Sequence, residues 1–302
     1  MHIPDGFLTN RVALSLGAVS AASILYAARR VKLEAEGRLV PLMGVLGAFT
    51  LAAQMLNFPV LGGTSGHLVG GALLAILLGP MAALLTMTTV VLAQALFLQD
   101  GGLLALGANV FSIAAVTTLS GYATYRALGG AGAVGRRLAV SSFVAGWVSL
   151  MLSAASCALA LAVSGAIPLG VGLTAMLGYH AVIGIAEGGL TAGMIVFIAR
   201  VRLDLLTENH ARRFHGADWA FNILFVAVPF AILAIAGSSE LPDPLQGLLG
   251  ERTPSGGTAA RSEALASPER FEDYAARAGI FVVLIAATYL VSRLAHRRRH
   301  GA

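Results

Sequence analysis

Charged residues are scarce in this chain. Lys, Arg, Asp and Glu together make up 12% of its 302 residues, whereas a soluble domain carries roughly 25%. Hydrophobic residues account for 57%, and the mean hydropathy is +0.80. Apolar runs recur at lengths near the roughly 20 residues that a helix needs to cross a bilayer. The composition therefore predicts an all-α polytopic membrane protein, with lipid as its surroundings and no nucleic-acid partner.

Cysteine and common catalytic motifs are nearly absent. Cys157 is the only cysteine, which excludes an intrachain disulfide and a multi-cysteine metal cluster; we interpret it as a packed thiol. The sequence has no GxxxxGK[ST] phosphate loop and no HExxH motif, so we expect neither an ATPase site nor a peptidase of that type. The opening MHIPDG lacks the basic n-region of a cleavable signal peptide. We therefore expect Met1 to remain the first residue, since methionine is usually trimmed only before a small residue.

Apolar segments of membrane-span length recur along the whole sequence. The stretch 66–98 would form a helix about 50 Å long at about 1.5 Å per residue, too long for a hydrocarbon core of about 30 Å. Gly79-Pro80 predicts a break within it, so we expect two passes there. The predicted spans are 11–28, 40–58, 68–79, 80–98, 103–125, 138–163, 171–198, 219–237 and 276–294.

Basic residues cluster in four segments: 29–38, 126–137, 200–213 and 293–299. The positive-inside rule places these segments in the cytoplasm, which puts the N-terminus outside and the C-terminus inside the bacterial plasma (inner) membrane. A shift in composition near residue 200 divides the chain into two parts. The first is a seven-helix core, 1–200, and the second is a two-helix C-terminal hairpin, 201–302, with a polar external loop at 238–275.

Topology sorts the seven histidines. Four lie among cytoplasmic arginines, and we interpret them as part of a solvated basic face: His210, His215, His296 and His300. His2 and His67 are both external, beside segments rich in Gly and Pro. His180 and Glu187 share one face of the span 171–198. A role in orienting a metal ligand and a helix-packing hydrogen-bond network explain this pair equally well.

The first two residues offer three nitrogens in chelating order. The Met1 amine and the His2 backbone amide close a five-membered ring with a metal, and the amide and His2 Nδ1 close a six-membered one. With the amide deprotonated the set is planar, and one imidazole from elsewhere, for which His67 is the external candidate, completes a square. Such coordination suits Ni(II) or Cu(II) better than Zn(II), which prefers a tetrahedron. The alternative is a disordered terminus and a turn capped by His67.

Four separated stretches carry a resemblance to a known family. They are MHIPDGFL at the start, GGTSGHLVGGALLAILLGP around His67, GGLLALGANVF at 101–111 and YHAVIGIAEGGLTA at 179–192. In this order they resemble the metal-capture subunit of energy-coupling-factor transporters for nickel and cobalt, the NikM/CbiM family. The hairpin 201–302 is similar to the accessory subunit NikN, although its PDPLQG departs from that subunit's usual Pro-Asp-Gly-Leu-Glu.

The resemblance implies a helix bundle that captures Ni(II) or Co(II) from outside as a transported substrate, with no cofactor. The ligands would be the Met1 amine, the amide and imidazole of His2, and the His67 imidazole, with Asn109 orienting a ligand by a hydrogen bond. The implied partners are a transmembrane coupling subunit and cytoplasmic ATPase subunits. The first span offers a small-xxx-small surface for packing with the coupling subunit: Gly17, Ala18, Ala21 and Ala22.

Other functions stay open at this point. An intramembrane metal-dependent enzyme needs a base, and only Glu187 lies within a predicted span. A self-sufficient secondary carrier uses inverted repeats and a coupling carboxylate at the midplane, and the sequence has no strong internal repeat. A planar nitrogen set that includes an amide favours low-spin Ni(II), and so does the NikN-like hairpin. A cobalt importer subunit for cobalamin synthesis is the alternative.

Overall fold

The computed structural model describes residues 1–34, 39–55, 57–60, 64–201 and 245. Both predicted spans of the hairpin 201–302 lie outside the described residues, and so does the external loop 238–275 apart from Leu245. So do the four histidines assigned to the cytoplasmic face: His210, His215, His296 and His300. The accessory hairpin and the total of nine spans therefore stay predictions.

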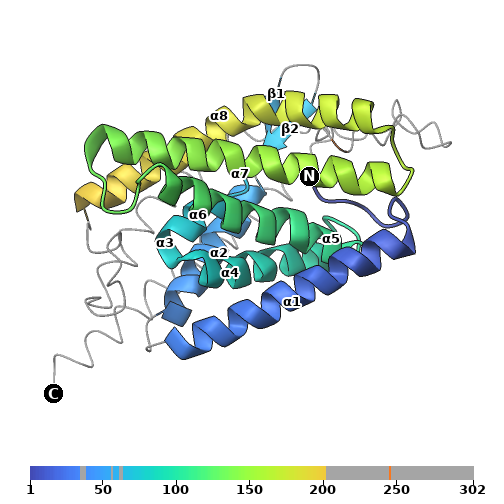
Figure 1. Ribbon diagram of the computed structural model, residues 1–302, viewed down its shortest axis with the longest axis horizontal. Helices are drawn as coiled ribbons and strands as arrows, with labels where there is room; N and C mark the ends of the chain where they lie inside the picture. The colour runs from blue at the N-terminus through green and yellow to red at the C-terminus, as the bar shows by residue number, and fades with distance from the viewer. Residues whose placement is uncertain (35–38, 56, 61–63, 202–244, 246–302) are drawn as a thin grey trace, which may run out of the picture.

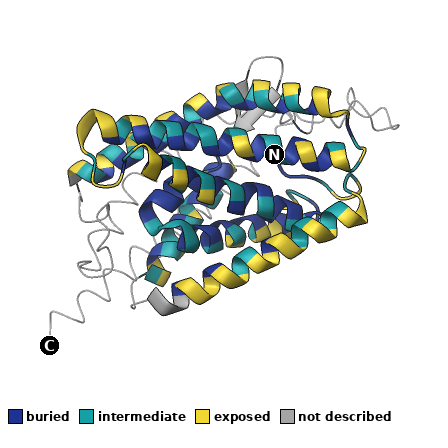
Figure 2. Ribbon diagram, viewed as in Figure 1, coloured by how far each residue is buried: buried dark blue, intermediate teal, exposed yellow. Residues whose placement is uncertain are grey.

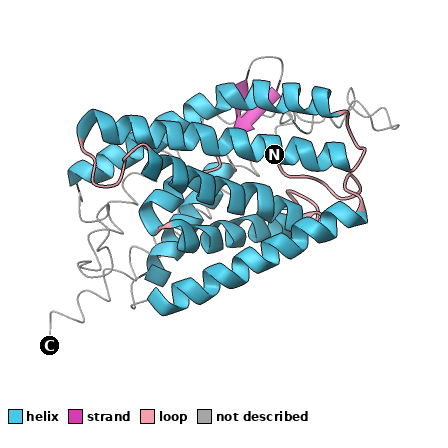
Figure 3. Cartoon of the chain, viewed as in Figure 1, coloured by secondary structure: helices cyan, strands magenta, loops and turns pink. Residues whose placement is uncertain are grey.

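Helices make up almost all of the described part of the chain (Figures 1 and 3). Two of them, α4 and α5, run on without a break into π-helical turns, η1 and η2. In chain order the elements are α1 (Asn10–Glu34), α2 (Leu39–Gln54), β1 (Asn57–Val60), β2 (Thr64–His67), α3 (Gly71–Leu78), α4 (Pro80–Ala93), η1 (Gln94–Leu98), α5 (Leu106–Asn109), η2 (Val110–Val116), α6 (Thr117–Ala127), α7 (Gly135–Val163) and α8 (Leu169–Val201).

The predicted membrane character is confirmed. Five of the described helical segments are long and apolar enough to cross a bilayer: Asn10–Val31, Pro80–Leu98, Leu106–Ala127, Gly135–Val163 and Leu169–Arg200. The two other helices of the expected core, α2 and α3, are shorter, with 16 and 8 residues. The seven-helix, all-α core is therefore confirmed over the described residues, with one short β-hairpin added to it.

The break at Gly79-Pro80 occurs where the sequence predicts it. Gly79 has a φ of 79°, a left-handed value that favours glycine, and Pro80 occupies the first position of α4, where its missing N–H leaves no bond unmade. Helix α3 stops one residue earlier and is buried over nearly its whole length. It covers only about 12 Å at about 1.5 Å per residue, so it is too short to cross a hydrocarbon core of about 30 Å by itself.

The predicted span 40–58 is wrong at its C-terminal end. Helix α2 ends at Gln54, and strand β1 begins at Asn57. Pro59 explains the difference, because proline lacks a helical N–H and disfavours the helical conformation at the residue before it, Phe58. Strands β1 and β2 pair antiparallel with Asn57 opposite His67. His67 therefore ends a β-hairpin and leads directly into the short helix α3.

Helix α3 lies at the centre of the bundle, against α4 and α6, and it also contacts α2, α7 and α8. Figure 2 shows it buried, in contrast to the exposed outer side of α1. Two glycines permit the close approach of α3 and α6. A Cβ at Gly71 would overlap the side chain of Thr117, and a Cβ at Gly121 would lie 2.8 Å from Ala72 Cα.

Helix α1 packs along one side of the bundle, opposite the paired helices α7 and α8 (Figure 1). Its predicted docking residues divide between two faces. A Cβ at Gly107 would lie 2.5 Å from Gly17 Cα, so Gly17 serves the contact between α1 and α5. The three alanines of the set are exposed: Ala18, Ala21 and Ala22.

Replacement of Gly71 tests the packing of α3. The added methyl of Gly71→Ala overlaps Thr117 and lies 3.3 Å from its backbone carbonyl carbon, so we expect a loss of about 1–3 kcal/mol in unfolding free energy. Gly44→Ala in α2 is the matched control, because nothing lies within 4 Å of its added Cβ. Thermal unfolding of the detergent-solubilised chain measures both. Equal melting temperatures for the two variants would contradict this packing.

Candidate metal centre

The N-terminus is threaded into the bundle. Met1, His2 and Ile3 are buried, with exposed fractions of 1%, 5% and 0%. The main chain of Ile3 pairs with the Asn109 side chain, because Ile3 N–H donates to Oδ1 at 2.8 Å and Nδ2 donates to the Ile3 carbonyl at 3.0 Å. Gly102 N–H donates to the same carbonyl at 2.9 Å. These bonds satisfy the buried backbone of the terminus and fix its depth.

Asp5 attaches the next turn of the chain to the start of α5. Its carboxylate accepts hydrogen bonds from three successive backbone N–H groups, those of Leu103, Leu104 and Ala105, at 3.1, 2.8 and 3.1 Å. Such groups at the start of a helix have no partner within it. A Cβ at Gly102 would overlap the Asp5 carboxylate, so the close approach requires glycine. The terminus is thus held at two points, Ile3 and Asp5.

The Met1 amine lies beside the His67 ring. The distance from the amine nitrogen to His67 Nε2 is 3.3 Å. His67 Nδ1 lies 3.0 Å from the Leu68 carbonyl, which can only accept, so Nδ1 carries the hydrogen and Nε2 presents its lone pair to the amine. Burial, followed by the charges of the amine and of His2, lowers the pKa of His67 to about 4. At neutral pH the ring is therefore uncharged, the state in which a histidine binds a metal.

His2 lies next to both groups. Its ring and that of His67 are nearly parallel, with centroids 5.7 Å apart and an interplanar angle of 19°. Its Nε2 lies 3.1 Å from Gln94 Oε1, an acceptor, so Nε2 carries the hydrogen. Its Nδ1 is buried and lies 3.2 Å from Asp100 Oδ1, within ion-pair range but not aligned for a hydrogen bond. The chelating nitrogen of His2 is therefore the one left without a directed bond.

Asp100 brings a negative charge to this cluster. Burial alone raises the pKa of its carboxyl group, but contact with His2 and the positive charge of the Met1 amine outweigh that effect and hold the pKa well below its usual value. The side chain is 41% exposed, so it lies where the cluster meets the surface. The next residue, Gly101, has a φ of 95°, and a Cβ there would lie 3.1 Å from His2 Cβ.

Two π-helical turns flank the site. Gln94, which contacts the His2 ring, is the first residue of η1, and Asn109, which holds Ile3, immediately precedes η2. π-Turns are rare in proteins, but those that occur are often found at functional sites. The extra residue in the turn changes where the side chains point. On the other side of the terminus, Cys157 lies 3.9 Å from the Met1 carbonyl, with its thiol as donor. This agrees with the prediction of a packed thiol.

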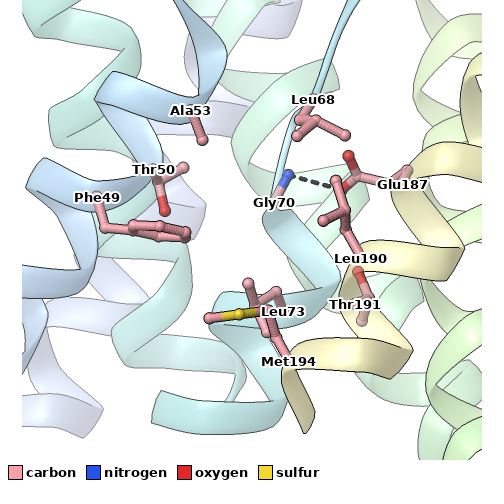
Figure 4. A pocket seen from close by; sticks show the side chains of 10 residues that line it. All are labelled: Phe49, Thr50, Ala53, Leu68, Gly70, Leu73, Glu187, Leu190, Thr191 and Met194. Atoms are coloured by element: carbon pink, nitrogen blue, oxygen red, sulfur yellow. Dashed lines mark hydrogen bonds between the residues drawn. The ribbon is translucent and has the colours of Figure 1, made fainter. Parts of the chain in front are cut away.

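Glu187 holds the segment that follows His67 (Figure 4). Its carboxylate accepts hydrogen bonds from the backbone N–H groups of Val69 and Gly70, at 2.9 and 2.7 Å. These two residues link His67 to α3, so a side chain on α8 fixes the position of the histidine through the main chain. The contact forms one wall of a small cavity of about 30 Å³ between α2, α3 and α8.

His180 is placed differently. It is buried, and its Nδ1–H donates to the Met176 carbonyl at 2.7 Å, a contact within α8. Seven residues, about 10 Å along a helix, separate it from Glu187. The contacts of Met1, His2, His67, Asn109 and Glu187 form one connected site.

Three residues of this site are absent from the sequence-based set: Asp5, Gln94 and Asp100. The sequence contains signals for two of them. Gln94 is a lone amide in the apolar run VVLAQALF, and Asp100 precedes Gly101-Gly102 at the external end of a predicted span. A carboxylate beside two glycines at the end of a span favours a functional loop, but nothing in the sequence pairs it with His2.

Side chains alone do not form a metal site here. Over the described residues, no group of three or more His, Cys, Asp or Glu side chains is arranged to hold a metal ion. The cluster instead offers two imidazoles, an amine and the backbone amide that joins Met1 to His2. Neighbouring nitrogens in a square with bonds of about 2 Å are about 2.8 Å apart, so the 3.3 Å between the amine and His67 Nε2 is close to that spacing.

The family described as "Cobalt uptake substrate-specific transmembrane region", CbiM, matches residues 2–205. The chain is 46% identical over 210 residues to a protein of Haloquadratum walsbyi that is named for metal transport, which covers 68% of this chain and 93% of that one. It is 32% identical over 254 residues to the fused nickel transport protein NikMN of Rhodobacter capsulatus, which covers 78% of this chain and 73% of that one.

A solved structure supports the same relationship. The crystal structure of a transition metal transporter, 31% identical, matches with a TM-score of 0.62 over 72% of this chain and 100% of that chain. The family match extends over most of the chain and includes His2, His67, Asn109 and Glu187, and it confirms the resemblance to NikM/CbiM. This integral, multi-pass membrane protein belongs to the cobalt uptake substrate-specific transmembrane family, CbiM.

Proposed function

We propose that this chain is the substrate-binding membrane subunit of an ATP-driven energy-coupling-factor importer for nickel, or cobalt, and that it captures the ion at its external face. One observation carries the proposal: the buried Met1 amine lies 3.3 Å from His67 Nε2, next to the His2 ring. Burial of an amine is unfavourable unless a partner offsets it. A site that uses the amine as a metal ligand accounts for this arrangement.

The ligand set consists of four nitrogens. The Met1 amine, the His2 amide and His2 Nδ1 form two fused chelate rings, and His67 Nε2 occupies the fourth corner. Supporting bonds already fix both rings, since Gln94 engages His2 Nε2 and Leu68 engages His67 Nδ1. Such bonds select the tautomer that leaves the other nitrogen for the metal. Binding in this form requires that the amide lose its proton, which favours Ni(II) in a planar site.

Asp100 balances the charge of the loaded site. A divalent ion bound to one deprotonated amide, a neutral amine and two neutral imidazoles leaves one net positive charge in a buried position. The Asp100 carboxylate lies 3.2 Å from His2 Nδ1 and is the carboxylate whose charge acts on His67. Because the side chain is partly exposed, water screens part of its effect.

Coupling to transport requires partner subunits, and the exposed face of α1 supports a docking surface for one of them. Its outer face carries Leu14 and Leu25, which are 74% and 61% exposed, together with Ala18, Ala21 and Ala22. Small residues on such a face allow another helix to approach closely. The transmembrane coupling subunit would dock there. Cytoplasmic ATPase subunits would supply the energy by hydrolysing ATP, since the sequence of this chain has no phosphate loop.

Two alternatives receive less support. The Glu187 carboxylate accepts two backbone N–H bonds, which suits a structural anchor better than the base of an intramembrane enzyme or the coupling carboxylate of a secondary carrier. Cobalt remains the second candidate metal, because the matching family is described for cobalt uptake. The same four nitrogens could bind Co(II), for supply to cobalamin synthesis.

The amine can be tested by lengthening the chain. Two alanines placed before Met1 convert the amine into an amide and move the new terminus away from His67. Because loss of a supporting partner already costs about 10–100-fold in metal affinity, loss of a ligand should weaken nickel binding at least about 100-fold. A single added residue is less informative, since it makes His2 the third residue, an order that can chelate by itself.

The control carries the same two alanines after Ala302. Titration calorimetry with Ni(II) and the visible absorption of planar Ni(II) measure the two proteins side by side in detergent. Unchanged nickel affinity in the N-terminally extended protein would exclude the amine as a ligand.

Replacement of His67 leaves a three-nitrogen chelate with an open corner. His67→Ala should weaken nickel binding by at least about 100-fold, and added imidazole should restore part of the affinity because it can occupy the empty position. His180→Ala removes another buried histidine and should change the affinity by less than about threefold. Calorimetry with and without imidazole provides the measurement. Equal losses in both variants would mean that the effect is structural.

Asp100→Asn keeps the shape of the side chain and removes its charge. We expect nickel to bind about 3- to 30-fold more weakly, a range that allows for screening at a partly exposed site. Asp100→Glu should retain most of the affinity. The melting temperature of the metal-free protein serves as the control for folding. Wild-type affinity in Asp100→Asn would show that its carboxylate does not balance the bound charge.

A further inference from the structure

A cavity of about 420 Å³ opens between the start of α7 and the end of α8. Its size falls within the range of about 300–1,000 Å³ that is typical of small-molecule sites. Two arginines line it, one from each helix: Arg136 and Arg200. The other described residues that line it are mainly apolar, among them Leu138 and Ala139 from α7 and Val196 from α8.

Among the described residues, the positive charge of the cavity has no acidic partner. Both arginines are exposed, and no Asp or Glu of the described residues forms an ion pair with either of them. The first turn of α7 adds backbone N–H groups, and Val134 provides no side-chain hydrogen bond to cap them. A ligand for this cavity must therefore bring negative charge together with an apolar part that fits the aliphatic wall.

The position of the cavity along the membrane-spanning helices indicates its depth in the bilayer. It lies at the ends of two membrane-spanning helices, at the same end of the bundle as the C-terminal end of α1 (Figure 1). The metal site lies near the other end, since Cys157, which contacts Met1, is about 33 Å from Gly135 along α7 at about 1.5 Å per residue. The cavity is therefore at headgroup level on the side predicted to be cytoplasmic.

We propose that this cavity binds the headgroup of an anionic phospholipid from the inner leaflet. The planar guanidinium groups of Arg136 and Arg200 match the geometry of phosphate oxygens. Basic pockets between membrane helices on the cytoplasmic side are typical sites for anionic headgroups. The apolar wall formed by Leu138 and Val196 faces the start of the acyl chains. A free phosphate ion also offers oxygens to the two guanidinium groups, but it has no apolar part to contact the apolar wall.

Native mass spectrometry and thermal unfolding of the full chain in a nonionic detergent test the proposal. Three probes are added separately: phosphatidylglycerol, phosphatidylcholine and inorganic phosphate. We expect phosphatidylglycerol to bind and to raise the melting temperature, and the other two to have little effect. In the double variant Arg136→Gln/Arg200→Gln the apparent Kd for phosphatidylglycerol should rise about tenfold or more, because two charge-assisted contacts are lost.

Two further variants separate a site from general attraction between charges. Arg29→Gln/Arg30→Gln removes two charges from α1 at the same end of the bundle and should leave the Kd within about twofold. Ala139→Phe keeps both cavity arginines but fills the space between the helices, and it should weaken binding as much as the double variant. Equal weakening in the α1 control, unchanged binding in Ala139→Phe, equal effects of phosphatidylcholine, or an equal effect of inorganic phosphate would each overturn the proposal.

Discussion

The Met1 amine lies 3.3 Å from His67 Nε2 in the interior of the bundle. The other contacts of the site hold the N-terminus at the depth that this short distance requires. An amine in such a place has lost its hydration and must gain partners in return. Asn109 and Gly102 bind the main chain of Ile3, and Asp5 binds three amides at the start of α5. Together they determine how deep the first residue lies, and hence which nitrogens face one another. Several hydrogen bonds within the protein hold the terminus in this position.

The two halves of the site come from different parts of the fold. The terminus is held by the segment 100–109 between η1 and η2, whereas His67 is held by the β-hairpin and by Glu187 on α8. The distance between the amine and His67 therefore depends on how α8 and the β-hairpin sit relative to the segment 100–109. Cys157 on α7, the helix that packs along α8, also contacts Met1 and links the two parts.

Sequence patterns predicted much of this arrangement. Apolar length and the Gly79-Pro80 pair were sufficient for the helices and for the break between α3 and α4, because both depend on local backbone chemistry. The end of α2 was predicted incorrectly, because the prediction followed the apolar run through residue 58 and gave too little weight to Pro59. The contact of Asp100 with His2 joins residues almost one hundred positions apart, and no local pattern encodes it. The sequence grouped Gly17 with the three neighbouring alanines as one docking surface. The contact between Gly17 and Gly107 shows which side of α1 faces the bundle, and the sequence pattern does not contain this information.

X-ray absorption at the nickel edge of the metal-loaded chain tests the central claim most directly, because it reports the geometry and the identity of the ligands together. We expect four nitrogen ligands in a plane, with the outer-shell scattering of two imidazole rings, one each from His2 and His67. A six-coordinate site with oxygen ligands, or scattering from fewer than two imidazoles, would contradict it.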